Sequence, residues 1–185
     1  MAAIGMPGDD AIATHRRLLE QWRKAMDLVG PGPIDPHFQD AEGSVDGLAA
    51  MGAWADLGSG AGFPGITLAA RHPQAQVSLV ESREKRALFL HKVVAQAKLA
   101  NASVVHGRTE SLPGGQFDGI ISRAYKPPPA VLADAARLLK PGGRIVLLLG
   151  DGALPILPTQ WVEPQTHRYP VGKGWRLRLM ATLVS

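Results

Sequence analysis

One stretch of the sequence decides the fold: Ala55-Asp56-Leu57-Gly58-Ser59-Gly60-Ala61-Gly62-Phe63-Pro64-Gly65. An apolar run at residues 53–57 leads into this stretch, and a helical apolar pattern at residues 64–71 follows it, so it is expected to connect a strand to a helix. Glycines in such a turn adopt positive φ without a Cβ clash and let backbone amides approach a ligand. The stretch therefore predicts a ligand-binding loop in an α/β sheet.

Outward from this loop, short apolar runs alternate with helical patterns. Further strands are predicted at residues 77–80, 103–106, 117–122 and 144–149, and further helices at residues 83–97 and 130–139. This alternation is typical of a parallel sheet with crossover helices. Residues 161–169 and 175–184 are strand-like and are separated by Pro-Val-Gly-Lys-Gly, which predicts an antiparallel hairpin.

The N-terminal part of the chain has a different pattern. Apolar residues at helical spacing predict a helix over residues 9–29, the segment 30–36 is expected to be a linker, and residues 37–51 carry no clear period. The predicted fold class is α/β: a mostly parallel, doubly wound, Rossmann-like sheet with a C-terminal antiparallel hairpin and an N-terminal helical extension. We expect residues 1–52 to form the extension, packed on a core domain of residues 53–185.

Composition limits the chemistry. The chain has 185 residues, 45% of them hydrophobic, and a mean hydropathy of -0.00, which is typical of a compact domain. It has no cysteine, so disulfides, thiolate metal sites and cysteine nucleophiles are excluded, and no metal is expected. No apolar run reaches the roughly 18 residues of a membrane span. A net charge of +4 is compatible with nucleic-acid binding but does not establish it.

Two ligand patterns overlap in the loop. Residues 60–65 match the G-x-G-x-x-G fingerprint of dinucleotides, whereas Asp56-x-Gly58-x-Gly60-x-Gly62 matches the loop of S-adenosylmethionine (SAM)-dependent methyltransferases. SAM has no phosphate, so an acid at the end of the first strand can help to hold its ammonium or sulfonium end. Glu81 ends the next predicted strand, where a carboxylate accepts ribose hydroxyls of either cofactor. Together with the hairpin, these features favour SAM over NAD, and an ordinary tight turn is the remaining alternative.

Several segments carry a resemblance to a known family. They are Leu18-Leu19-Glu20-Gln21-Trp22, His37-Phe38-Gln39-Asp40-Ala41, the loop from Asp56 to Gly65, and Phe117-Asp118-Gly119-Ile120-Ile121-Ser122-Arg123-Ala124. On these segments the chain resembles the RsmG/GidB family of bacterial 16S ribosomal RNA guanine-N7 methyltransferases, from about Leu18 to Ser185. The resemblance implies a Rossmann-like methyltransferase fold, SAM as cofactor and small-subunit ribosomal RNA as substrate and partner.

The resemblance also implies site residues. Those expected around the cofactor are Asp56, Gly58, Ser59, Gly60, Gly62, Phe63, Glu81, Thr109, Glu110 and Arg123. Arg123 is also the candidate catalytic residue, facing the methionine end of SAM or the incoming guanine, and His37, Tyr125 and Lys126 are candidates for RNA contact. Three of these residues also have an interpretation without a functional role: Arg123 as a surface cation, Glu110 as a turn residue and His37 as a loop histidine.

The expected chemistry needs few side chains. Guanine N7 is a bare acceptor, so no proton has to leave before it attacks, and we expect positioning rather than a general base to carry catalysis. We expect a monomeric enzyme that acts in the cytoplasm and has no membrane partner. Two alternatives stay open: a SAM-dependent methyltransferase of a small molecule, and a SAM-binding module without turnover on RNA.

Overall fold

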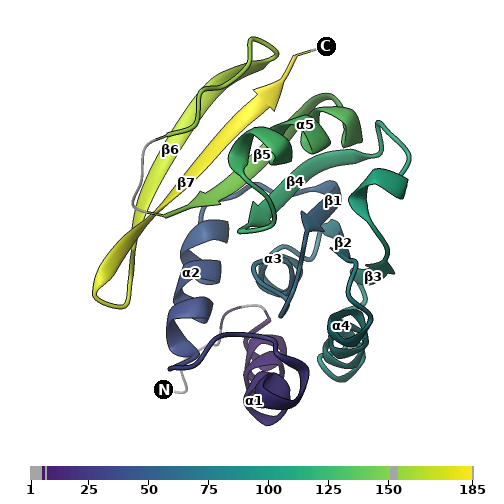
Figure 1. Cartoon of the computed structure of the whole chain (residues 1–185), viewed down its shortest axis with the longest axis vertical. Coiled ribbons are helices and arrows are strands. Elements are labelled where there is room, and N and C mark those ends of the chain that lie inside the picture. Colours follow the sequence, from purple (N-terminus) through teal and green to yellow (C-terminus); the bar gives the residue numbers. More distant parts are fainter. Residues whose placement is uncertain (1–5, 7, 151–153, 185) are drawn as a thin grey trace.

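The computed structural model describes residue 6 and residues 8–150 and 154–184. Its elements follow one another as α1 (Asp9–Met26), α2 (Asp35–Val45), β1 (Gly52–Leu57), α3 (Gly65–Arg71), β2 (Ala75–Glu81), α4 (Glu84–Gln96), β3 (Ala102–His106), the short 3-10 helix η1 (Thr109–Ser111), β4 (Phe117–Arg123), α5 (Pro128–Leu138), β5 (Leu139–Leu149), β6 (Trp161–Val171) and β7 (Gly174–Leu183). This order confirms the predicted alternation of strands and helices (Figure 1).

The strands form one sheet of seven, in the order β3-β2-β1-β4-β5-β7-β6. β1 to β5 pair in parallel, and β7 runs antiparallel between β5 and β6. The predicted hairpin is therefore confirmed. The strand order reverses between β1 and β4, and ligands of such sheets bind beyond the carboxyl ends of the strands at this switch point.

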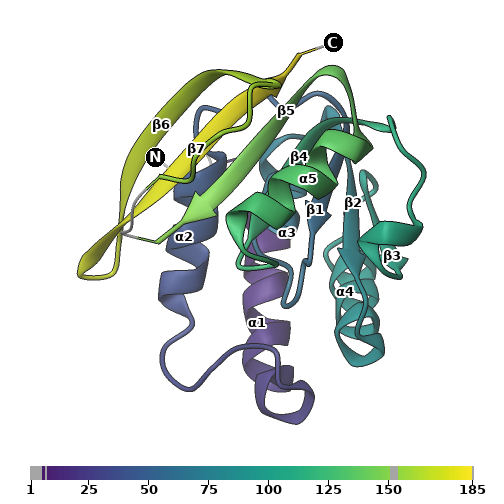
Figure 2. The same ribbon diagram turned by 45° about the horizontal axis from the view of Figure 1, so that its top comes forward.

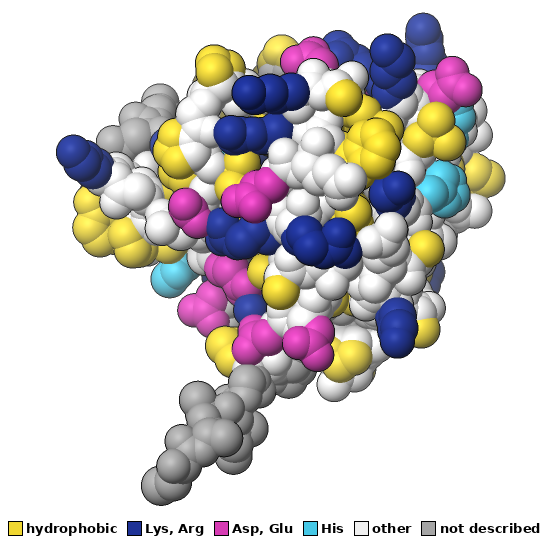
Figure 3. All heavy atoms as spheres, turned by 90° about the horizontal axis from the view of Figure 1, so that it is seen from below, with side chains coloured by type: hydrophobic (Ala, Val, Ile, Leu, Met, Phe, Trp, Pro, Cys, Tyr) yellow, Lys and Arg dark blue, Asp and Glu magenta, His cyan; other side chains and the backbone are white. Residues whose placement is uncertain are grey.

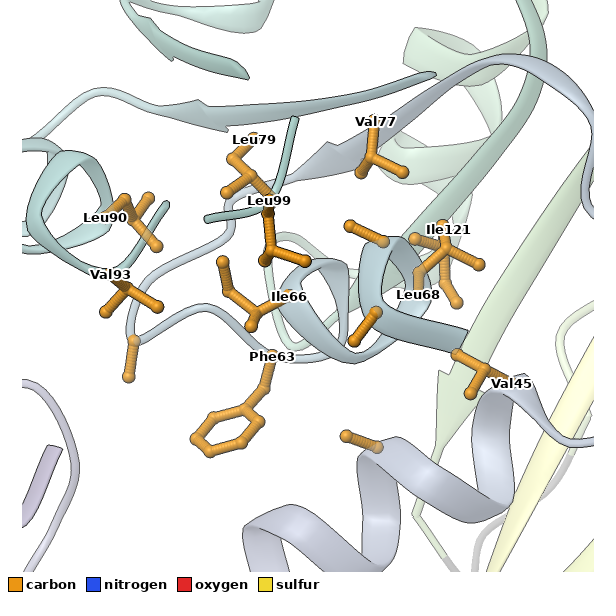
Figure 4. Packing of buried hydrophobic residues seen from close by; sticks show 14 of the residues in the cluster. Val45, Phe63, Ile66, Leu68, Val77, Leu79, Leu90, Val93, Leu99 and Ile121 are labelled. Carbon is orange, nitrogen blue, oxygen red and sulfur yellow. The ribbon is translucent and has the colours of Figure 1, made fainter. Parts of the chain in front are cut away.

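Helices cover both faces of the sheet (Figures 1 and 2). One hydrophobic cluster joins α1, α2, α3 and α4 to the sheet, and a second joins α5 to the opposite face. Figure 4 shows the first cluster, in which Ile66 and Leu68 of α3 lie among side chains of α2, α4 and the strands. None of the described helices combines the length and the apolar character that spanning a bilayer requires.

Helix α2 is the main element that the sequence did not predict. Residues 37–51 have no clear apolar period because the buried face of α2 includes two polar side chains, Asp40 and Ser44, beside Phe38, Ala41 and Val45. Polar groups on a buried face weaken the helical pattern on which a sequence prediction depends. The linker was correctly expected from residue 30, but Asp35 and Pro36 already belong to the first turn of α2.

Several element ends differ from expectation by one or two residues, and two differ by more. β5 begins at Leu139 rather than at residue 144, because Leu139 already pairs with Phe117 of β4, before a register irregularity that precedes the pair Gly119–Arg144. α1 ends at Met26 rather than at residue 29, since Asp27 adopts a left-handed conformation with φ of 50° and its backbone N–H donates to the Arg23 carbonyl. Left-handed residues of this kind commonly end helices.

Candidate active site

Two adjoining cavities open at the carboxyl ends of the parallel strands. The first, of about 400 Å³, is lined by residues that follow β1 to β4: Gly58, Val80, Glu81, Ser82, Arg83, Arg86, Gly107, Arg108, Thr109, Glu110, Ala124, Tyr125 and Lys126. The second, of about 590 Å³, is lined by Pro36, His37, Asp40, Arg123, Ala124, Lys126, Pro128, Leu148, Leu149, Gly150, Val171 and Arg176. Both volumes are in the range of small-molecule sites. Ala124 and Lys126 line both cavities, so the segment after β4 forms their common wall.

The glycine loop forms one side of the first cavity. Gly58 has φ of 72°, and a Cβ on it would lie 2.5 Å from Cδ2 of Tyr125. The backbone amides of Gly58 and Ser59 both donate to the Val80 carbonyl, and the Ser59 hydroxyl donates to the Asp56 carbonyl at 2.9 Å. The loop is thereby tied to the ends of β1 and β2, and only glycine fits beneath the Tyr125 ring.

Glu81 lies where the sequence expected a ribose-binding acid. Its side chain is buried and lines the first cavity. One carboxylate oxygen accepts the Gly60 amide at 2.9 Å, and the other accepts the Arg83 amide at 2.8 Å. Because each carboxylate oxygen has two lone pairs, Glu81 keeps acceptor capacity for a ligand while it fixes the glycine loop.

Asp56 lies beneath the loop. Its side chain is fully buried, and one oxygen, Oδ2, accepts the Gly65 amide at the start of α3 at 3.0 Å. The other, Oδ1, has no hydrogen-bond partner among the described residues. Burial raises the pKa of Asp56 to about 7. The observed contact of Asp56 is thus with the backbone of the loop and helix.

An aromatic cluster supports the loop from the N-terminal helices. His15 of α1 is fully buried, and its Nε2 lies 2.7 Å from the Ala61 carbonyl, so Nε2 carries the proton and donates. Burial lowers the pKa of His15 to about 4, which keeps the ring neutral. Phe63 lies in the same cluster, with ring centroids 4.8 Å from His15 and 4.9 Å from Phe38. Gly62, with φ of 93°, gives the loop room against His15 and Ile66.

Polar side chains of η1 and of the segment after β4 also line the first cavity. The Tyr125 hydroxyl donates to Oγ1 of Thr109 at 2.7 Å, which links the segment after β4 to η1. Lys126 lies 2.8 Å from Glu110 and 2.8 Å from Asp134, and these carboxylates raise its pKa. Hydrogen bonding to Lys126 lowers the pKa of Glu110. Lys126 therefore lies in the common wall, already paired with two acids.

Arg123 ends β4 and lines the second cavity. Its Nη1 lies 3.0 Å from Oδ2 of Asp40, and its guanidinium lies over the Phe63 ring, 5.0 Å from the centroid. The other Asp40 oxygen accepts the Tyr169 hydroxyl at 2.9 Å. His37 lines the same cavity and stacks on Phe63 at 5.7 Å, and burial lowers its pKa.

The structure brings the predicted residues together in three groups. Gly58, Glu81, Thr109, Glu110, Tyr125 and Lys126 line the first cavity, whereas His37, Arg123 and Lys126 line the second. Asp56, Ser59 and Phe63 are buried behind the loop, and Gly60 and Gly62 shape its backbone.

The sequence interpretation missed the contributions of His15, Asp40 and Tyr169. The sequence signal for His15 was its position on the apolar stripe of α1, three residues after Ile12. The signal for Asp40 was its position one helical turn after His37. No local pattern indicated Tyr169.

Three arginines of α1 have partners within the molecule. Arg16 pairs with Asp35 at 2.6 Å, Arg17 donates to Gln96 at 2.9 Å, and Arg23 donates to the Gly32 carbonyl at 2.6 Å. Figure 3 views the side on which α1 lies and shows acidic side chains interspersed with the basic ones. Of the cations that line the second cavity, Arg123 and Lys126 are likewise paired with acids, and Arg176 is exposed.

Two solved structures that share the fold are named as methyltransferases. A SAM dependent methyltransferase from Aquifex aeolicus superimposes with a TM-score of 0.62 at 16% identity, covering 92% of this chain and 98% of that one. A methyltransferase from Pyrococcus furiosus superimposes with a TM-score of 0.64 at 17% identity, covering 94% and 98%. At these identities the likeness establishes the fold, which confirms the predicted Rossmann-like methyltransferase architecture.

Curated relatives are more similar in sequence. The Ribosomal RNA small subunit methyltransferase G of Xanthomonas axonopodis pv. citri is 35% identical over 159 residues, which cover 81% of this chain and 74% of the relative. The protein of the same name from Nitratidesulfovibrio vulgaris (strain DP4) is 34% identical over 185 residues, covering 91% and 84%. The family described as GidB, rRNA small subunit methyltransferase G, matches residues 10–162. The chain therefore belongs to the GidB family.

Proposed function

We propose that this protein is an enzyme that transfers a methyl group from SAM to N7 of a guanine in small-subunit ribosomal RNA. The observation that carries the proposal is the pair of cavities with a common wall at Ala124 and Lys126, one lined by the glycine loop and the other by Arg123. A cofactor in the first cavity and a base in the second would meet at this wall. Family membership supports the substrate, and a ribosomal substrate implies work in the cytoplasm.

The residues of the first cavity fit SAM. The glycine loop presents backbone close to the cavity, and Glu81 offers acceptor lone pairs suited to ribose hydroxyls. Thr109 and Glu110 would lie around the adenine, and Gly58 would lie near the methionine part. Asp56 would act from beneath the loop, by holding the start of α3 through the Gly65 amide.

The reaction requires little proton chemistry from these side chains. SAM supplies a methyl carbon activated by the sulfonium, and the sulfur takes the electron pair of the broken bond. Guanine N7 supplies its own lone pair, so no residue has to remove a proton first. Arg123 would donate to the base edge at O6 and leave N7 free, while the walls of the second cavity exclude water. Tyr125, which was predicted to contact RNA, lines the first cavity and not the second, so it would lie beside the cofactor.

The test uses methyl-labelled SAM with unmodified small ribosomal subunits and with their extracted RNA. After digestion, we expect the label in N7-methylguanosine with the wild-type protein and a loss of roughly a hundredfold or more with Arg123→Ala, the cost of a charged contact made at the reacting base. Arg17→Ala is the matched control, since it removes an exposed arginine of α1 far from the cavities.

Three other results would each contradict a part of the proposed function. Label in another nucleoside would refute the N7 assignment. No label in RNA, with SAM binding intact by calorimetry, would favour a small-molecule substrate or a binding module. No SAM binding would refute the cofactor.

A further inference from the structure

Three elements converge on the Asp40 carboxylate. Asp40 belongs to α2 and is 5% exposed, Arg123 ends β4, and Tyr169 belongs to β6. Oδ2 of Asp40 lies 3.0 Å from Nη1 of Arg123, and Oδ1 accepts the Tyr169 hydroxyl at 2.9 Å. Each carboxylate oxygen thus has one strong partner, and the chain Tyr169–Asp40–Arg123 runs from the C-terminal hairpin to the edge of the second cavity.

Tyr169 is held firmly at its end of this chain. Its ring is 4% exposed and packs against α2 at Gly43, where an added Cβ would lie 2.3 Å from the ring carbon Cδ2. Burial and the neighbouring Asp40 carboxylate raise the pKa of the Tyr169 hydroxyl, so that it remains protonated and keeps donating. The missing side chain at Gly43 is what allows the hydroxyl to reach Asp40.

The hairpin register explains why Tyr169 faces this site. Tyr169 pairs with Arg176 across the hairpin, and Val171 lies two residues further along β6. Residues at such positions share one face of a sheet. Val171 and Arg176 both line the second cavity, so this face of the hairpin forms part of the cavity to which Arg123 belongs.

Arg123 is held from two directions. Asp40 holds one nitrogen, and the Phe63 ring lies beneath the guanidinium plane, which leaves the remaining donors for the cavity. A free arginine side chain has many rotamers, and ordering it during binding opposes binding. Contacts that order it beforehand give a preorganised donor.

We propose that Tyr169 and Asp40 are positioning residues that hold the Arg123 guanidinium in place for the substrate base. The C-terminal hairpin thereby sets the orientation of a group at the reacting base. The proposal rests on the proposed function in one respect, namely that Arg123 meets the substrate.

The decisive test is a double-mutant cycle on rRNA methylation. Tyr169→Phe keeps the ring against Gly43 and removes the hydroxyl. Since one hydrogen bond corresponds to a factor of roughly two to ten, we expect kcat to fall by about that factor while the Kd of SAM stays unchanged. In the Arg123→Ala background, the same substitution should leave the residual rate unchanged, because its effect passes through Arg123.

Two further variants separate positioning from stability. Gln39→Ala removes another bond between α2 and the hairpin, the one from the Gly172 amide to Oε1 of Gln39 at 2.7 Å, without touching Arg123. We expect it to leave kcat unchanged. Asp40→Asn keeps the shape but removes the charge, and it should lower kcat at least as much as Tyr169→Phe. Equal loss in both Arg123 backgrounds, or an equal loss from Gln39→Ala, would overturn the proposal.

A readout independent of activity is the mobility of the Arg123 side chain, measured by NMR on the arginine-labelled protein. The rotation rate of its guanidinium should be slow in the wild type and faster in Tyr169→Phe. If the wild type does not methylate rRNA, the proposed function fails while this measurement still tests the positioning contact. If rRNA is methylated and Tyr169→Phe changes neither kcat nor the mobility of Arg123, the positioning role is refuted.

Discussion

Asp56 and His15 are buried ionisable residues that contact the glycine loop, at the Gly65 amide and the Ala61 carbonyl, and burial moves their pKa values in opposite directions. The pKa of Asp56 rises from 3.8 to about 7, so the folded protein holds a proton that the unfolded chain releases, and stability decreases as pH rises from about 4 to about 7. The pKa of His15 falls from 6.5 to about 4, so stability decreases as pH falls through that interval. Between pH 4 and 6.5 the two contributions oppose each other.

The difference in stability between each variant and the wild type should therefore isolate the contribution of the group that is removed. We expect the free energy of unfolding of Asp56→Asn, relative to the wild type, to increase as pH rises from 4 to 7, with a slope of at most about 1.4 kcal/mol per pH unit, and to level off above pH 7. His15→Gln, which keeps a donor for the Ala61 carbonyl, should gain relative to the wild type as pH falls from 6.5 to 4. Denaturant unfolding across this pH range measures both differences. Curves parallel to that of the wild type would refute these assignments.

At the scale of elements, the β1–α3 loop depends on a glycine beneath Tyr125. Gly58 has φ of 72° and no space for a Cβ, whereas Gly115, before β4, has a similar φ of 65° with nothing within 4 Å. The two positions therefore share the backbone constraint and differ in crowding. Gly115 precedes β4, at the sheet edge opposite the cavities.

We expect Gly115→Ala to lose about 1–2 kcal/mol of stability, the cost of an L-residue in the left-handed region, and Gly58→Ala to lose more, because its Cβ would also overlap Tyr125. Only Gly58→Ala should also weaken SAM binding, because Tyr125 and the loop must separate. Each 1.4 kcal/mol of lost binding free energy raises the Kd of SAM roughly tenfold. Calorimetric titration with SAM and thermal unfolding distinguish the two effects. Equal SAM affinities for both variants would show that the crowding at Gly58 has no bearing on the cofactor.

Helix α2 is the element that connects the two ends of the chain. It supplies Asp40 to Arg123, Gly43 to the Tyr169 ring and Gln39 to the Gly172 amide. Arg178 of β7 also donates to the Ser44 and Asp46 carbonyls at the end of the helix. The hairpin and the N-terminal helices are thus joined by specific polar contacts as well as by apolar packing.

For the whole molecule the net charge is +4, and basic side chains on different sides differ in how many acidic neighbours accompany them. On the side bearing α1, acids accompany the basic residues (Figure 3), whereas Arg176 is exposed at the edge of the second cavity. Phosphate contacts release counterions and make RNA binding salt-dependent.

Arg176→Gln should therefore weaken binding of extracted small-subunit rRNA and reduce the slope of log K against log salt by about 1, the contribution of one phosphate contact. Lys98→Gln is the matched control. Lys98 is an exposed cation that precedes β3, and β3 is the edge strand opposite the hairpin edge of the sheet. Its slope should equal that of the wild type. If both variants reduce the slope equally, binding depends on total charge and not on the cavity edge.

The local sequence pattern was sufficient to predict the parallel sheet, the glycine loop and the C-terminal hairpin, because each depends on apolar period and turn residues within a short segment. It also indicated the side chains that follow directly on strands, such as Glu81 and Arg123, since the carboxyl ends of parallel strands meet at one edge.

The contacts of those side chains, in contrast, depend on the folded arrangement of the whole chain. Asp56 lies next to the last residue of β1 and Glu81 ends β2, yet Asp56 lies beneath the loop and lines neither cavity, whereas Glu81 lines the first. Asp40 meets Arg123 across 83 residues and Tyr169 across 129. A polar residue on a buried helix face obscures the helical pattern, and its partner can be identified only when the chain is folded, because a hydrogen bond depends on distance in space and not on separation in sequence.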